Sequence, residues 1–223
     1  MPLEPQPLSH VAADALAPMI APARTALLVI DIQNDFAGPN GVGARVGLDR
    51  ELAEGVIDRI ENLIESARTS GAPIFFARVI TRPETDSTAL KTLMRRRGRP
   101  GAEGICRAGT PGADYYRVQP RAGDGEIDKP LFSCFYGTDF DAQLRAKGVD
   151  TLVLTGMTTD CCVDCTARDA FHHNYNVFVV SDATCAYSDA LHAGALSGLE
   201  KNCALLTTAT DVMRAWTPDS SAA

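Results

Sequence analysis

Residues 25–31, TALLVID, form a continuous apolar run that ends in an acid. A strand with apolar side chains on both faces needs cover on both faces, as inside a parallel sheet. Between residues 50 and 69 the period changes, because apolar side chains there recur at helical spacing before Gly71 supplies a stop. PIFFARVI at 73–80 again predicts a strand. This order predicts a βαβ unit with parallel strands.

The same alternation continues through the second half of the chain. Strands are expected at 126–130, 151–157, 176–182 and 203–208. Helices are expected near 138–147, 160–173 and 189–201, with a short one before the tail SSAA. The pattern predicts an α/β fold in which an open parallel sheet carries helices on both faces.

Residues 82–126 interrupt this rhythm, because they are rich in Gly, Pro and Arg. They predict a long excursion with a short helix near 87–95, and such segments are often binding loops or lids. The basic run MRRRGRP at 94–100 is expected to be a solvated loop. Alternatively, one of its arginines reaches a substrate carboxylate or a neighbouring subunit; the candidates are Arg95, Arg96, Arg97 and Arg99.

Size and charge narrow the class of protein. With 223 residues and 45% hydrophobic side chains, we expect one domain at 25–215, an N-terminal arm at 1–24 and a C-terminal tail at 216–223. The net charge of −7 argues against nucleic-acid binding. No run approaches the about 18 apolar residues of a membrane span. The odd number of cysteines, seven, does not suit a disulfide scaffold, so a cytoplasmic location is expected.

Three reactive side chains follow predicted strands. Asp31 ends the first strand, Lys129 ends the short middle strand, and Cys162 begins the helix after 151–157. Ligands bind at the carboxyl ends of parallel strands, so these side chains should meet at one edge. A helix start and an ammonium favour a thiolate, and a carboxylate can exchange a proton with it. From spacing alone, an inert buried cysteine with an unrelated acid and lysine stays equally open.

Three motifs favour the catalytic interpretation of these side chains over the inert one: ALLVIDIQNDF, DKPLFSCFYGTDF and TGMTTDCCVDCTARDAF. Together they resemble the isochorismatase-like cysteine hydrolase family over about residues 25–210. The resemblance implies a three-layer α/β/α sandwich around a central parallel sheet, a homodimer or homotetramer, and a catalytic triad of Asp31, Lys129 and Cys162. Cys162, unlike Cys161 or Cys165, directly precedes a Val and stands four residues before a Thr, as the family pattern requires.

The resemblance also implies the chemistry around this cysteine. A non-proline cis peptide would join Met157 to Thr158, and the N–H groups of Thr158 and Cys162 would form the oxyanion hole. Members that cleave the vinyl ether of isochorismate lack the cysteine, so the complete triad favours hydrolysis of a small amide, ureido or N-carbamoyl compound through a thioester. The motif TTD resembles members that act on N-carbamoylsarcosine or biuret.

Expected substrate contacts are Gln33, Phe36, Phe135, Tyr136 and Thr159. Nicotinamidase-type members carry histidines after the second strand, whereas residues 80–97 here contain none. We therefore expect no catalytic metal and no cofactor, and a nicotinamidase-like hydrolase of an aromatic amide is the alternative. Two rivals of other classes are a thiol oxidoreductase, since Cys162 and Cys165 form a C-x-x-C, and a non-catalytic binding protein on the same fold.

Overall fold

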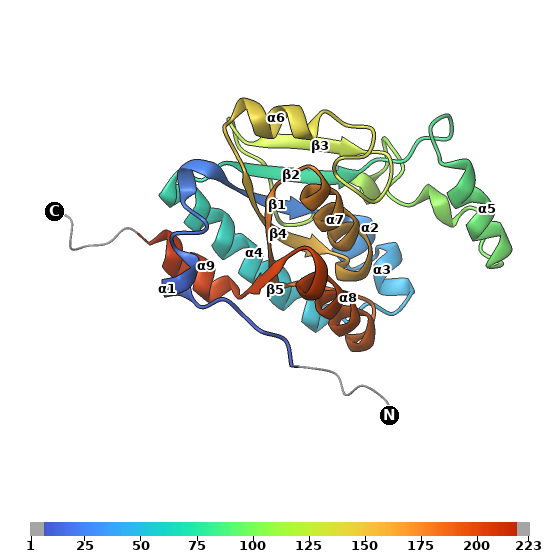
Figure 1. The fold of residues 1–223 in the computed structure, drawn as a ribbon. Coiled ribbons are helices and arrows are strands. Elements are labelled where there is room, and N and C mark those ends of the chain that lie inside the picture. Colours follow the sequence, from blue (N-terminus) through green and yellow to red (C-terminus); the bar gives the residue numbers. More distant parts are fainter. Residues whose placement is uncertain (1–6, 218–223) are drawn as a thin grey trace.

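The computed structural model describes residues 7–217, and within them six parallel strands form one sheet in the order β3-β2-β1-β4-β5-β6 (Figure 1). The strands are β1 (Thr25–Ile30), β2 (Ile74–Val79), β3 (Gly125–Lys129), β4 (Thr151–Met157), β5 (Asn176–Cys185) and β6 (Leu205–Thr207). The helices are α1 (Ala13–Leu16), α2 (Asn34–Ala37), α3 (Val42–Arg45), α4 (Arg50–Ser70), α5 (Thr88–Arg96), α6 (Phe140–Ala146), α7 (Asp164–His172), α8 (Asp189–Asn202) and α9 (Ala209–Trp216).

Helices cover both faces of the sheet, which explains the apolar strands. Leu27 and Val29 of β1 pack with α1, α4 and α9, whereas Leu28 and Ile30 pack with α6, α7 and α8. Since alternate side chains of a strand point to opposite faces, every residue of β1 is buried. The predicted three-layer α/β/α architecture is confirmed.

Helix α4 shows how local signals set the boundaries. The Asp49 carboxylate accepts a hydrogen bond from the N–H of Leu52 at 3.1 Å and caps the helix start. Gly71 ends the helix with φ +78°, a left-handed conformation that glycine adopts without steric cost. The predicted helix at 160–173 differs, because a π-helical turn (Thr159–Val163) precedes α7. The short helices α1, α2 and α3 were not predicted, since one helical turn carries no periodic pattern.

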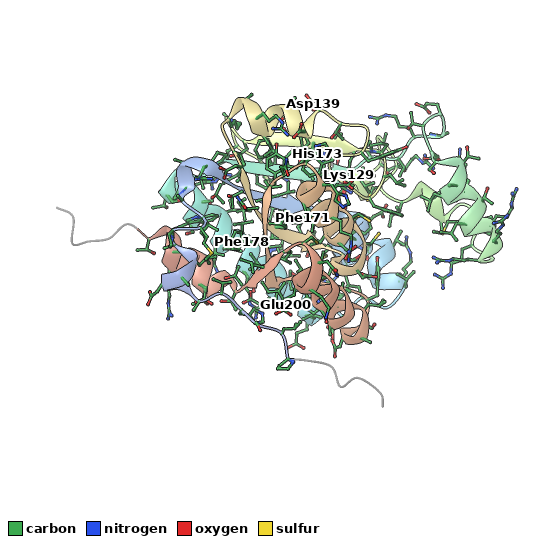
Figure 2. All side chains as sticks on the ribbon, viewed as in Figure 1. Lys129, Asp139, Phe171, His173, Phe178 and Glu200 are labelled. Carbon is green, nitrogen blue, oxygen red and sulfur yellow. The ribbon has the colours of Figure 1, made fainter. Side chains whose placement is uncertain are left out.

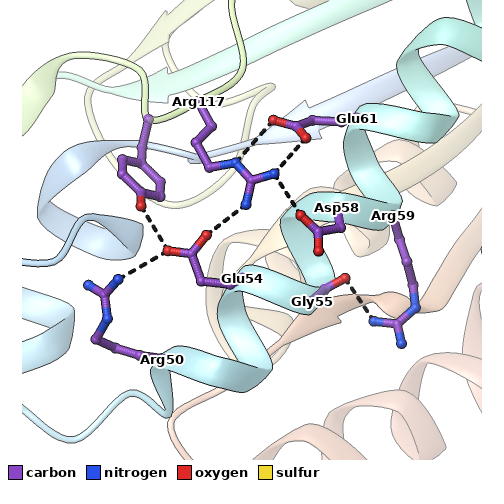
Figure 3. A network of polar contacts seen from close by, with 8 residues as sticks. Arg50, Glu54, Gly55, Asp58, Arg59, Glu61 and Arg117 are labelled. Carbon is purple, nitrogen blue, oxygen red and sulfur yellow. Dashed lines mark hydrogen bonds and ion pairs between the residues drawn. The ribbon is translucent and has the colours of Figure 1, made fainter.

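The excursion after β2 divides into two parts. Its helix α5 has no buried residue and projects away from the sheet (Figure 1). The part before β3 is anchored instead, because the guanidinium of Arg117 binds three carboxylates of α4, those of Glu54, Asp58 and Glu61 (Figure 3). The N–H of Tyr116 also donates to the carbonyl of Ile32 at 2.9 Å, which ties this part to the end of β1.

The N-terminal segment before β1 belongs to the core. Leu16 and Ile20 are fully buried on the α4 and α9 side of the sheet. The indole N–H of Trp216 donates to the carbonyl of Ile20 at 2.8 Å, so this segment joins α9. Residues 1–6 of the expected arm and 218–223 of the expected tail lie outside the described residues. Between residues 7 and 217, no helix has the length and apolar character to cross a membrane.

Candidate active site

Asp31 lies just past β1 with φ +54°, and its side chain is fully buried. One carboxylate oxygen, Oδ1, accepts a hydrogen bond from the N–H of Val79 at 2.9 Å. The other, Oδ2, is 2.8 Å from the ammonium of Lys129. Strand β2 therefore fixes one oxygen, and the second is held by a charge that comes from β3.

Lys129 ends β3, where it pairs in register with Val79 of β2. Its side chain is fully buried, and Nζ contacts Asp31 and donates a further hydrogen bond to the carbonyl of Leu131 at 3.0 Å. Figure 2 marks the position of Lys129 in the fold. Burial opposes the charge of this ammonium, but Asp31 and then Cys162 outweigh burial, so that the pKa of Lys129 lies above its ordinary value. Lys129 is consequently a permanent cation at neutral pH.

Cys162 reaches the same edge from the other side of β1. Strand β4 neighbours β1, with Gly156 opposite Ile30. Gly156 has φ +116°, and a Cβ there would lie 2.0 Å from the carbonyl oxygen of Ile30, so only glycine fits this close approach. The predicted cis peptide between Met157 and Thr158 is present. It leads directly into the π-helical turn that carries Cys162.

The surroundings of Cys162 favour a thiol at rest. A hydrogen bond with the Cys161 side chain, then burial and the charge of Asp31, raise the pKa of Cys162 well above its usual range, while Lys129 acts in the opposite direction. The hydrogen bond with Cys162 lowers the pKa of Cys161 instead. The buried carboxylate and the neighbouring sulfur therefore act against the helix start and the ammonium, which favour the thiolate.

Several residues near this site had no signal in the sequence. Cys106 of the excursion is fully buried, and burial and then Asp31 raise the pKa of its thiol. Burial, and then the proximity of Cys162, raises the pKa of Tyr187 to about 12. Tyr187 follows β5, whose last residue Cys185 pairs with Met157. Only the strand order brings Tyr187 to the cysteine.

Two of the expected substrate contacts, Gln33 and Thr159, are buried polar side chains with partners inside the protein. Gln33 is fully buried, and its amide N–H groups donate to the carbonyls of Val79 and Ala113, so its side chain joins two backbone segments. Thr159 is likewise buried, with its hydroxyl 2.8 Å from Nδ1 of His192.

The aromatic candidates also differ in position. Phe135 stacks on His173 with ring centroids 4.8 Å apart, away from the strand tips. Phe36 packs partly buried with the small cluster that contains Ile80 and Cys106. Tyr136, by contrast, is 60% exposed and lines a cavity of about 550 Å³ beside the end of β3. In the described part of the chain, no group of three or more His, Cys, Asp or Glu side chains is placed to hold a metal ion.

Comparison with known proteins agrees with this arrangement. The isochorismatase domain model matches residues 25–211. Ureidoacrylate amidohydrolase RutB of Methylobacterium radiotolerans is 35% identical over 213 residues, which cover 90% of this chain and 78% of that protein. A cysteine hydrolase from Pseudomonas syringae pv. phaseolicola 1448A has a similar structure with a TM-score of 0.78 at 25% identity, covering 95% of this chain and 97% of that one.

N-carbamoylsarcosine amidase from Thermoplasma acidophilum is also similar, with a TM-score of 0.67 and 30% identity over 83% of this chain and 96% of that one. The family model spans most of the chain and includes Asp31, Lys129 and Cys162. This protein therefore belongs to the isochorismatase domain family.

Proposed function

We propose that this protein is a cysteine-dependent amidohydrolase that cleaves a C–N bond in a small amide, ureido or N-carbamoyl compound. One observation carries the proposal: a fully buried Asp31–Lys129 ion pair lies close enough to Cys162 to shift its pKa. A buried ion pair is costly to desolvate, and perturbed groups of this kind gather at functional sites. The names of relatives, ureidoacrylate amidohydrolase and N-carbamoylsarcosine amidase, support hydrolysis of such bonds.

In the proposed reaction, Cys162 enters as a thiol. As its sulfur attacks the carbonyl carbon of the substrate, the thiol proton passes to Asp31, which is the adjacent base. The N–H groups of Thr158 and Cys162 donate to the oxyanion of the tetrahedral intermediate. Asp31 then returns the proton to the leaving nitrogen, the C–N bond breaks, and a thioester to Cys162 remains.

Water completes the cycle. Asp31 takes a proton from a water molecule that adds to the thioester carbonyl. The C–S bond then breaks to release the acid, and Asp31 returns the proton to the Cys162 sulfur, which regenerates the thiol. Lys129 stays charged throughout, because its pKa lies above its ordinary value. Its role is to hold the Asp31 carboxylate in position through both proton transfers.

The test is an ammonia-release screen over small amides, ureido compounds and N-carbamoyl amino acids. We expect the wild type to release ammonia and Cys162→Ala to release none above background. Cys165→Ser is the matched control, since a hydrolase tolerates it whereas a C-x-x-C oxidoreductase requires both thiols. Equal turnover by wild type and Cys162→Ala would refute the cysteine mechanism, and loss of activity in Cys165→Ser would favour the redox alternative.

We further propose a homodimer or homotetramer in a reducing, cytoplasmic setting. All seven cysteines are free thiols, which suits such a compartment. The projecting helix α5, which buries no residue in the single chain, supports a contact with a second copy. Light scattering of the purified protein measures the mass directly, and a monomer at micromolar concentration would contradict the oligomer.

A further inference from the structure

The π-helical turn Thr159–Val163 carries Cys162 into α7. The N–H of Val163 donates to the carbonyl of Thr158 at 3.1 Å. Turns of this kind are rare and are frequent at functional sites. Among residues 7–217, no side chain caps the start of this turn, and Oδ1 of Asp160 is buried without a hydrogen-bond partner. The shape of the turn therefore depends on contacts with other elements.

Thr159 supplies such a contact. Its side chain is fully buried, and its hydroxyl lies 2.8 Å from Nδ1 of His192, which belongs to the first turn of α8. In the described part of the chain, this is the only hydrogen bond that joins a side chain of residues 158–163 to another element. A hydroxyl both donates and accepts, so the bond forms with either tautomer of the imidazole. One contact thus ties the turn before Cys162 to α8.

Helix α8 is a firm support for His192. Ser188 caps the helix by accepting a hydrogen bond from the N–H of Leu191 at 3.3 Å, and the N–H of His192 donates to the carbonyl of Ser188 at 3.0 Å. Leu196 and Leu199 are buried, and α8 packs against α7 (Figure 1). A side chain on a capped and packed helix holds its partner more precisely than a side chain on a loop.

We propose that His192 is a positioning residue, which holds the N–H groups of Thr158 and Cys162 in place through its hydrogen bond to Thr159. The inference rests on the proposed hydrolase function, in which those two N–H groups are the oxyanion donors. Thr159 lies between the two donors in the chain, so a tether there restrains both. A displacement of about 1 Å in such a group can cost about 100-fold in rate. In this role His192 transfers no proton and touches no substrate.

Two reagents separate the placement of the oxyanion donors from the accessibility of the thiol. p-Nitrophenyl acetate acylates a thiol through a tetrahedral oxyanion and releases p-nitrophenol, whereas iodoacetamide alkylates the sulfur by displacing iodide and forms no oxyanion. Absorbance of p-nitrophenolate measures acylation, with Cys162→Ala as the blank. Tandem mass spectrometry of the peptide that contains Cys162 measures alkylation.

His192→Leu should slow the Cys162-dependent acylation about tenfold or more, while alkylation of Cys162 changes less than about twofold. A role in stability alone would not separate the two rates in this way. His172→Leu is the matched control, because it makes the same change at an exposed position at the end of α7. We expect it to alter neither rate.

Further variants test the hydrogen bond itself. An Asn side chain carries polar atoms on Cγ, at the branch where Nδ1 of a histidine stands, so His192→Asn should recover most of the acylation rate. Thr159→Val removes the hydroxyl at a similar side-chain shape and should match the loss in His192→Leu. The double variant of Thr159→Val and His192→Leu should be no slower than either single one, because both remove the same contact. Should His192→Leu fail to fold, Thr159→Val carries the same test.

Three results would overturn the inference: acylation that His192→Leu leaves unchanged, equal losses of acylation and alkylation in a folded variant, or a wild type without Cys162-dependent acylation. If His192→Leu slows acylation selectively but no amide, ureido or N-carbamoyl compound is hydrolysed, the proposed function fails and the positioning role remains. If ammonia release depends on Cys162 while acylation is insensitive to His192, only this inference fails.

Discussion

Replacing Lys129 with methionine should destabilise the protein strongly, because it leaves the buried Asp31 carboxylate without its ammonium. The Nζ–Oδ2 distance is 2.8 Å and both side chains are fully buried. At an effective dielectric constant of about 20, the direct attraction at this distance is about 6 kcal/mol. The variant no longer bears the cost of burying the Lys129 ammonium, which offsets part of this lost attraction. We therefore expect a net loss of roughly 3–5 kcal/mol in the free energy of unfolding.

The loss is measurable as heat stability. In a domain of this size, 1 kcal/mol corresponds to about 2–4 °C in Tm, so Lys129→Met should lower Tm by roughly 6–20 °C. Calorimetry at pH 7 is the assay. The pKa of Lys129 is raised in the folded protein, so its contribution is present below the ordinary value of 10.5 and is lost only as pH rises through the folded value. The Tm difference should therefore stay constant between about pH 7 and 9.

A double variant separates the charge effect from a loss of packing. Asp31→Asn combined with Lys129→Met removes both charges, and an amide oxygen at position 31 can still accept the hydrogen bond from Val79. Because no unpaired buried charge remains, we expect the double variant to recover about half of the loss or more. A double variant that is less stable than Lys129→Met alone would refute the reasoning, as would a Lys129→Met protein with unchanged Tm.

Three further predictions follow from other parts of the structure. Iodoacetamide at pH 7 should modify Cys161 before Cys162, because their hydrogen bond lowers the pKa of the first and raises that of the second. Tandem mass spectrometry of the labelled wild-type peptide measures both rates, and faster labelling of Cys162 would contradict this assignment. Gly156→Ala should lower the free energy of unfolding by roughly 2–6 kcal/mol, through backbone strain and overlap with the Ile30 carbonyl. Urea unfolding measures this loss, and an unchanged stability would contradict the close approach of β1 and β4. Arg117→Ala should speed proteolytic cleavage of the segment just before β3 at low salt. The effect should be smaller in 1 M NaCl, because charges are screened there within about 3 Å. Cleavage rates that match the wild type would show that the carboxylate contacts of Arg117 do not anchor this segment.

Local pattern determined most of the elements. The apolar run at 25–30 is β1, the helical stripe after residue 50 is α4, and 151–157 is β4. These predictions succeed because side-chain periodicity and glycine stops act within one element. The sequence also predicted that Asp31 and Lys129 follow strands and meet, because parallel strands end at the same edge of a sheet.

Tertiary structure alone decided which side chains meet and in which direction their pKa values shift. The order of the strands, with β2 between β1 and β3, sets Asp31 and Lys129 2.8 Å apart. It also brings Tyr187 close to Cys162. A neighbouring sulfur, burial and a nearby carboxylate raise the pKa of Cys162, against the local effect of a helix start. Desolvation and long-range charge depend on neighbours that are distant in the chain, so no pattern within one element encodes them.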